Sequence, residues 1–158
     1  MDITFRTPEG RFNYRVCAII LHGGKILAMH DEVSPYYYLP GGRVKLHETA
    51  EEAVLREVSE ELLITPKIIR PLWFCQSFFT EDVTGENFHE LCVYFLIDVS
   101  EAGLIERGER FTLLERQHTH DFEWLDITEL KDKYFYPTFL KEKIVDLPET
   151  PQLLTERE

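Results

Sequence analysis

The segment from Thr49 to Leu62 has the strongest helical pattern in this 158-residue sequence, and it limits what the rest of the chain can form. Thr49 and Glu52 have the spacing of a capping box, in which a hydroxyl and a carboxylate bind the first free backbone amides. Pro66 closes the segment, because the residue before a proline avoids helical angles. The other long apolar runs are rich in β-branched and aromatic residues, which favours strands. The sequence therefore predicts a mixed α/β fold with one strong helix near its middle.

The remaining elements are predicted from apolar runs between turn signals. The expected strands are residues 12–22, 25–31, 36–40, 67–80, 88–99 and 122–127, and two short helices are expected at 128–133 and 137–145. The charged stretch 101–121 is expected to be a mobile loop. The length suits a single domain over residues 1–158, with a peripheral arm to about residue 11 and a loosely ordered tail at 147–158.

Charge and cysteine content exclude several classes of protein. Seventeen basic and 29 acidic residues give a net charge of −12, which repels duplex nucleic acid and anionic membranes. A small phosphate-bearing ligand remains compatible with this charge if a metal cation mediates the contact. Cys17, Cys75 and Cys92 have no CxxC spacing, so we expect buried thiols in a reducing compartment. Without a signal-peptide pattern or an apolar run of about 20 residues, a cytoplasmic location is expected.

The predicted helix gathers three carboxylates on one side. At about 100° per residue, Glu57, Glu60 and Glu61 share one arc, next to an apolar arc formed by Val54, Val58, Leu55 and Leu62. Like charges at this spacing repel each other, whereas a hard divalent cation favours carboxylate ligands and would remove the repulsion. On the helix alone, a metal site and a solvated acidic face are equally compatible with the pattern.

The loop before the helix favours the metal site. Gly42, Glu48 and the run from Arg56 to Glu61 have the spacing of a known motif, and the segment "GGRVKLHETAEEAVLREVSEELLI" resembles the Nudix box of the Nudix hydrolases. Leu63 stands where the family has glycine, just before Ile64. Because leucine adopts the left-handed conformation at a cost of about 1 kcal/mol or more, the helix is expected to run on to Thr65-Pro66. The resemblance implies a Nudix-type α/β/α sandwich with a mixed sheet.

The resemblance also implies a function and roles for named residues. The implied activity is hydrolysis, dependent on Mg²⁺ or Mn²⁺, of a pyrophosphate bond in a nucleoside diphosphate linked to another group. The alternative is a Nudix domain that binds a nucleotide without cleaving it, as a sensor. The metal is expected on Glu57, Glu60, Glu61 and the Gly41 carbonyl, and any one of these glutamates could instead orient the water or act as its base. Arg56 is expected to pair with Glu48 and to fix the loop against the helix.

Outside the box the residues leave alternatives open. Glu115 could be a further base or ligand, or simply solvated. Arg15 and His89-Glu90 could line a substrate cleft or a surface, one of Tyr37 and Tyr38 could stack on a base, and His118 and His120 lack a third metal ligand nearby. In some subfamilies a proline or a tyrosine beyond the box marks the substrate. The corresponding window here, "FTED" from Phe79 to Asp82, contains neither. Nucleotide sugars, ADP-ribose-like compounds and (d)NTPs therefore all remain candidate substrates, and a homodimer is compatible with the sequence.

Overall fold

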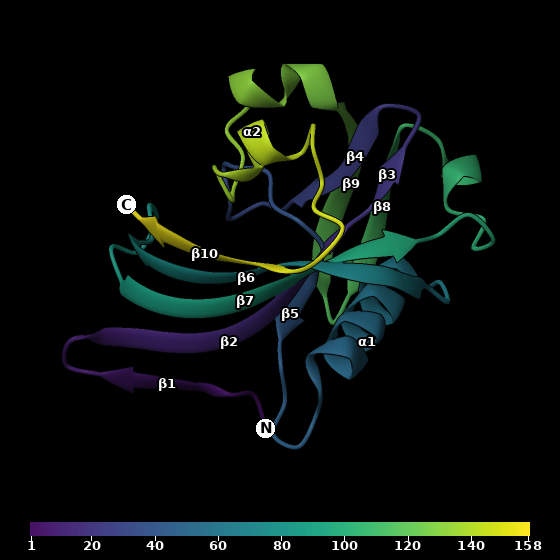
Figure 1. Cartoon of the computed structure of the whole chain (residues 1–158). Coiled ribbons are helices and arrows are strands. Elements are labelled where there is room, and N and C mark those ends of the chain that lie inside the picture. The colour runs from purple at the N-terminus through teal and green to yellow at the C-terminus, as the bar shows by residue number, and fades with distance from the viewer.

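The computed structural model describes all 158 residues and contains two sheets and one long helix (Figure 1). The helices are α1 (Ala50–Leu62), α2 (Leu140–Lys143) and the 3-10 turns η1 (Ile105–Arg107) and η2 (Ile127–Asp132). The strands are β1 (Thr4–Thr7), β2 (Gly10–Ile19), β3 (Leu21–His22), β4 (Lys25–His30), β5 (Gly41–Arg43), β6 (Lys67–Thr80), β7 (Asn87–Asp98), β8 (Arg110–Glu115), β9 (His118–Asp126) and β10 (Gln152–Arg157).

The larger sheet is mixed, as the sequence predicts. Its strand order is β1-β2-β7-β6-β10, with β5 paired to β2. The pairs β2–β7 and β6–β10 are parallel, and the other pairs of this sheet are antiparallel. The smaller sheet is antiparallel, with the order β3-β4-β9-β8. Figure 1 shows the larger sheet curving away to the left, with α1 below its right-hand end and α2 above it.

Strand β2 explains how the larger sheet is buried on both faces. Val16 and Ala18 belong to an apolar cluster that includes the buried residues of α1, whereas Cys17 and Ile19 belong to a second cluster that includes Leu140 of α2. Successive side chains of a strand point to opposite faces, so a strand covered on both faces has a continuous apolar run. The helices therefore lie on opposite faces of the sheet, in the predicted α/β/α arrangement.

Two expectations about the less apolar segments were wrong. The tail at 147–158 is not loosely ordered, because Gln152–Arg157 forms β10 in parallel register with β6. Residues 101–121 are not one mobile loop, because they hold β8 and the start of β9. The arm to residue 11 lies at the edge of the sheet, where it forms β1, and so agrees with the expected peripheral position. In each case backbone pairing with a strand distant in sequence, or across a hairpin, stabilises a polar segment that has little apolar pattern of its own.

Two smaller expectations concern the cysteines and the last helix. Cys17, Cys75 and Cys92 are all buried free thiols, as predicted. The last helix is shorter than expected, since only Leu140–Lys143 is α-helical. No helix of the structure has the length and apolar character that a membrane span needs.

Candidate active site

Helix α1 begins as predicted and ends differently. The Thr49 hydroxyl accepts a hydrogen bond from the Glu52 amide, and the Glu52 carboxylate accepts one from the Thr49 amide. The expected run-on to Thr65-Pro66 was wrong, because Leu63 takes the left-handed conformation with φ 56° and ψ 46°. Its side chain is 68% exposed and its amide donates to the Ser59 carbonyl. Leu63 thus ends the helix as a glycine would, without packing into the core.

Arg56 fixes the loop against the helix. Its Nε lies 2.7 Å from Glu48 Oε2 and its Nη2 lies 3.0 Å from Glu48 Oε1, so the expected pairing is present. Nη2 also donates to the Arg43 carbonyl at the end of β5, and Glu48 Oε1 accepts from the Lys45 amide. The hydrogen bond from Arg56 lowers the pKa of Glu48, which keeps this carboxylate charged. This bidentate contact holds β5 next to α1.

Glu57 lies where glycine leaves room for it. A Cβ atom on Gly42 would overlap the carboxylate of Glu57, so the box glycine is needed for this approach. Glu57 also accepts a hydrogen bond of 2.9 Å from Arg56 Nη1. Burial raises the pKa of Glu57, and the charges of Glu60 and Glu115 raise it further, against the opposing effect of Arg56. Glu57 is therefore a carboxylate held in an environment that disfavours its negative charge.

Glu61 is the most deeply buried of the box carboxylates. Only 6% of the residue is exposed, and its Oε1 accepts a 2.9 Å hydrogen bond from the Gly41 amide. Burial raises the pKa of Glu61 well above its usual range, and although the Gly41 hydrogen bond opposes this, the charges of Glu57 and Glu115 add to it. A buried carboxylate beside two others is destabilised unless a positive charge compensates for it.

Glu115 joins this group from the other sheet, at the end of β8. Its Oε2 is buried and has no hydrogen-bond partner. Its charge adds to the raised pKa of both Glu57 and Glu61. Glu60 is more peripheral, with a side chain that is 37% exposed and an Oε2 that lies 3.5 Å from Arg56 Nη1.

These residues fit a hard divalent cation in their chemistry. No three His, Cys, Asp or Glu side chains are disposed as a complete ligand set in this structure. Glu115 Oε2 is nevertheless buried without a partner, and the pKa values of Glu57 and Glu61 are raised, so the negative charge of these residues is poorly compensated. Carboxylate oxygens in such a group are the donors that Mg²⁺ and Mn²⁺ prefer.

A cavity of about 350 Å³ opens on the larger sheet, and Arg15 lines it, whereas Glu57, Glu60, Glu61 and Glu115 do not. Its floor is the α2-side face of the larger sheet, because Asn13, Arg15 and Cys17 alternate along β2 and all line it. Arg43 of β5 also lines it, which connects the cavity to the strand that Arg56 holds. The aromatic lining comes from several segments: Tyr36, Tyr38, Phe78, Phe79, Phe88, Tyr94, Tyr136 and Phe139.

Arg15 is positioned between the cavity and the carboxylates. It lines the cavity and forms no side-chain hydrogen bond, and its positive charge lowers the pKa of Glu61. Burial opposes its charge, but the groups around it, Glu90 first among them, together outweigh burial and raise the pKa of Arg15, so the guanidinium stays protonated. An unpartnered guanidinium at this place is suited to an anionic oxygen of a ligand.

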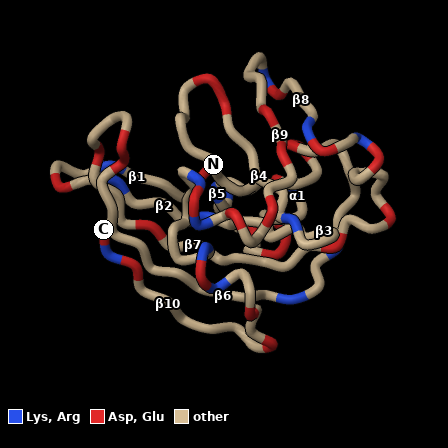
Figure 2. The backbone as a smooth tube through the Cα atoms, turned by 90° about the horizontal axis from the view of Figure 1, so that it is seen from above, with Lys and Arg blue, Asp and Glu red and all other residues tan.

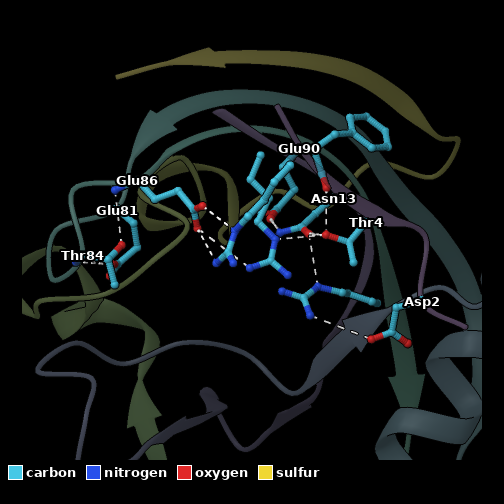
Figure 3. A network of polar contacts seen from close by, with 11 residues as sticks. Asp2, Thr4, Asn13, Glu81, Thr84, Glu86 and Glu90 are labelled. Atoms are coloured by element: carbon cyan, nitrogen blue, oxygen red, sulfur yellow. Dashed lines mark hydrogen bonds and ion pairs between the residues drawn. The ribbon is translucent and has the colours of Figure 1, made fainter. Parts of the chain in front are cut away.

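A polar network on the same face holds the floor in place (Figure 3). Asn13 is 3% exposed, and its Oδ1 accepts from the Thr4 hydroxyl at 2.6 Å and from Arg43 Nε at 3.1 Å, while its Nδ2 lies 3.3 Å from a Glu90 oxygen. The pKa of Arg43 is lowered by burial, then by the charges of Arg11 and Arg15, so these guanidinium groups lie close together. Figure 2 shows several Lys and Arg positions, drawn in blue, near β1, β2 and β5.

The structure brings some of the residues expected outside the box to this place and leaves others elsewhere. Arg15, Tyr38 and Glu90 line the cavity. Tyr37 does not line it, and its hydroxyl donates to Glu123 on β9 instead. The side chains that sequence reasoning missed are Asn13, Tyr36, Arg43, Tyr136 and Glu156. Only Asn13 carried a usable signal, because it lies two residues before Arg15 on the same strand.

Comparisons with known proteins agree with this geometry. The model of the NUDIX domain matches residues 11–144. An ADP-ribose pyrophosphatase from Methanocaldococcus jannaschii is 37% identical over 87 residues, which are 53% of this chain and 49% of that protein. The chain thus aligns with about half the length of this curated relative.

Solved structures show the same fold at low identity. A mutator MutT protein from Bacillus halodurans matches with a TM-score of 0.61 and 11% identity, over 92% of this chain and 89% of that one. An ADP-ribose pyrophosphatase from Streptococcus suis matches with a TM-score of 0.57 and 14% identity, over 90% and 98%. With a family model that covers most of its length, the chain belongs to the NUDIX domain family.

Proposed function

We propose that the chain is a metal-dependent pyrophosphohydrolase that cleaves the pyrophosphate bond of a nucleoside diphosphate linked to another group. The observation that carries the proposal is the buried Glu61, which accepts from the Gly41 amide, feels the charges of Glu57 and Glu115, and is offset by the unpartnered Arg15 that lines an aromatic cavity. A group of acids alone would repel a pyrophosphate. A bound cation, a free guanidinium and flat apolar walls together suit a nucleotide. The name of the M. jannaschii relative supports the same class of substrate.

The proposed roles follow from where each side chain lies. Glu57, Glu60 and Glu61, with the Gly41 carbonyl, would hold Mg²⁺ or Mn²⁺. The bound ion supplies charge neutralisation of the phosphate oxygens and lowers the pKa of water. Arg15 binds a phosphate oxygen at the cavity side.

Two further groups complete the proposed site. Glu115 accepts the proton of the attacking water, since its buried Oε2 has no hydrogen-bond partner. Tyr36, Tyr38 and Tyr136 enclose the base. Glu48 and Arg56 position the loop and touch neither the water nor the substrate.

A panel of nucleotides tests the proposal. ADP-ribose, nucleotide sugars and (d)NTPs are incubated with the protein and Mg²⁺ or Mn²⁺, and the products are separated by chromatography. We expect cleavage of at least one class with either metal, and a loss on the order of a hundredfold or more in kcat for Glu61→Gln. Glu142→Gln, an exposed change on α2, is the matched control and should leave the rate unchanged. If the protein binds a nucleotide but cleaves none of these classes, the result would favour the alternative, a Nudix domain that acts as a sensor.

A further inference from the structure

The C-terminal strand contributes to the floor of the cavity. Along β10, Leu153, Thr155 and Arg157 are exposed, whereas Leu154 and Glu156 are half-buried on the opposite face. Glu156 lines the cavity and is paired in register with Ser77 of β6, which is paired with Glu90 of β7. Because neighbouring strands lie about 4.8 Å apart, Glu156 and Glu90 are separated by about 10 Å across the floor.

Most carboxylates of the cavity already have a partner. Five of them line it: Glu81, Asp82, Glu90, Glu156 and Glu158. The Tyr36 hydroxyl donates to Glu81, and the hydroxyls of Tyr134 and Tyr136 donate to Asp82. Asn13 donates to Glu90 and the Thr138 hydroxyl donates to Glu158. Glu156 alone has neither a hydrogen bond nor an ion pair, so both of its oxygens are free to accept hydrogen bonds.

The surroundings of Glu156 suit the edge of a flat ring. Phe79 and Phe88 lie on the floor with stacked rings, at a centroid separation of 5.2 Å, and Tyr36 and Tyr136 stand nearby at 5.1 Å from each other. Rings of this kind hold a nucleobase by its faces. A charged carboxylate at the edge can only accept hydrogen bonds, so it attracts an amino group and repels a carbonyl oxygen.

We propose that Glu156 selects the base of the substrate, by accepting a hydrogen bond from an exocyclic amino group at the end of the cavity away from Arg15. The preferred substrates are then nucleotides of adenine, guanine or cytosine, and those of hypoxanthine and uracil are disfavoured. The proposal rests on the proposed function only in placing the base in this cavity and the phosphates at Arg15. It assigns a specificity role to a strand outside the Nudix box.

Matched nucleoside monophosphates test the proposal without any need for catalysis. AMP has an exocyclic amino group where IMP has a carbonyl, and the adjacent ring nitrogen carries a hydrogen only in IMP; CMP and UMP differ in the same way. Calorimetric titration of the whole protein should give AMP and CMP a dissociation constant about tenfold to a hundredfold lower than IMP and UMP, the range for a hydrogen bond to a charged group. In Glu156→Gln the two ratios should fall to within about threefold, because an amide can donate as well as accept. Glu142→Gln should keep the wild-type ratios.

The absolute affinities separate specificity from general electrostatics. Removal of one negative charge favours every anionic nucleotide, so Glu156→Gln should bind IMP and UMP more tightly than the wild type does. Equal tightening of all four nucleotides, with unchanged ratios, would overturn the specificity role of Glu156. The same holds for a wild type that binds AMP and IMP equally. The wild type could prefer AMP to IMP, and Glu156→Gln could lose this preference, while no nucleotide is hydrolysed. That result would support this inference and contradict the proposed hydrolase activity.

Discussion

Leu63 adopts a backbone conformation that suits glycine better than leucine. Its φ of 56° belongs to the left-handed region, where a side chain costs about 1 kcal/mol or more and glycine costs almost nothing. Since the side chain is 68% exposed, little packing is lost when it is removed. We expect Leu63→Gly to raise the free energy of unfolding by about 0.5–1 kcal/mol in urea denaturation.

The control for this change is Leu63→Ala. Alanine removes the same exposed side chain but keeps the Cβ that disfavours the left-handed conformation, so it should not stabilise the protein. A loss of stability in Leu63→Gly would mean that the leucine contributes contacts that outweigh its backbone strain.

Arg56 acts through geometry as much as through charge. It contacts both oxygens of Glu48, the Arg43 carbonyl and Glu57, which a lysine ammonium cannot do at once. We therefore expect Arg56→Lys to lower the free energy of unfolding by about 1–3 kcal/mol, although the charge is conserved. Arg110→Lys is the control, because Arg110 is 79% exposed and pairs only with Glu123, and it should change stability by less than about 0.5 kcal/mol. Equal effects of the two changes would contradict the bracing role.

The segment from Asp31 to Tyr38 forms one wall of the cavity, and the carboxylate of Asp31 holds this segment in its conformation. Asp31 accepts hydrogen bonds from the amides of Val33 and Ser34 and, at 2.6 Å, from the Tyr38 hydroxyl. Burial raises the pKa of Asp31, but these hydrogen bonds outweigh burial and lower it overall. A folded pKa below the unfolded value of about 3.9 stabilises the protein above that pH, and the contribution is lost as the pH falls through the folded pKa.

This sign gives a pH-dependent prediction for Asp31→Asn. The change should lower the free energy of unfolding by about 1 kcal/mol at pH 7, and the difference from wild type should shrink as the pH falls below about 4. Thermal unfolding at a series of pH values measures both. Glu32→Gln, an exposed neighbour that removes the same charge, should show neither effect. A difference that is constant with pH would show that the charge of Asp31 does not act through these bonds.

Elements with their own local signals could be predicted, and elements made by distant pairing could not. Helix α1 carries its cap at Thr49 and its stop near Pro66, and β6 and β7 carry long apolar runs. By contrast, β10 exists because it pairs with β6, some 80 residues earlier. The candidate site divides in the same way. The box carboxylates are local in sequence, whereas the cavity combines residues such as Asn13, Tyr136 and Glu156 that only the sheet order brings together.

The whole molecule carries a net charge of −12, and one of its acidic side chains, Glu61, is buried. Burial raises the pKa of Glu57 and Glu61, and the charge of Glu115 adds to both shifts, with Glu57 adding to that of Glu61. Such a site should destabilise the metal-free protein and should bind a divalent cation, and the binding should then stabilise the fold. A variant that lacks one of these charges should therefore be more stable than the wild type without metal, and it should gain less stability when a cation is added.

Thermal unfolding of wild type and Glu61→Gln, each with and without Mn²⁺, tests this claim most directly. The glutamine keeps an oxygen that can accept the Gly41 hydrogen bond but carries no charge. We expect the variant to melt at a higher temperature than the wild type in the absence of metal, and we expect Mn²⁺ to raise the melting temperature of the wild type by several degrees and that of the variant by little. An equal increase with Mn²⁺ in both proteins, or a less stable variant without metal, would contradict a metal site at Glu61.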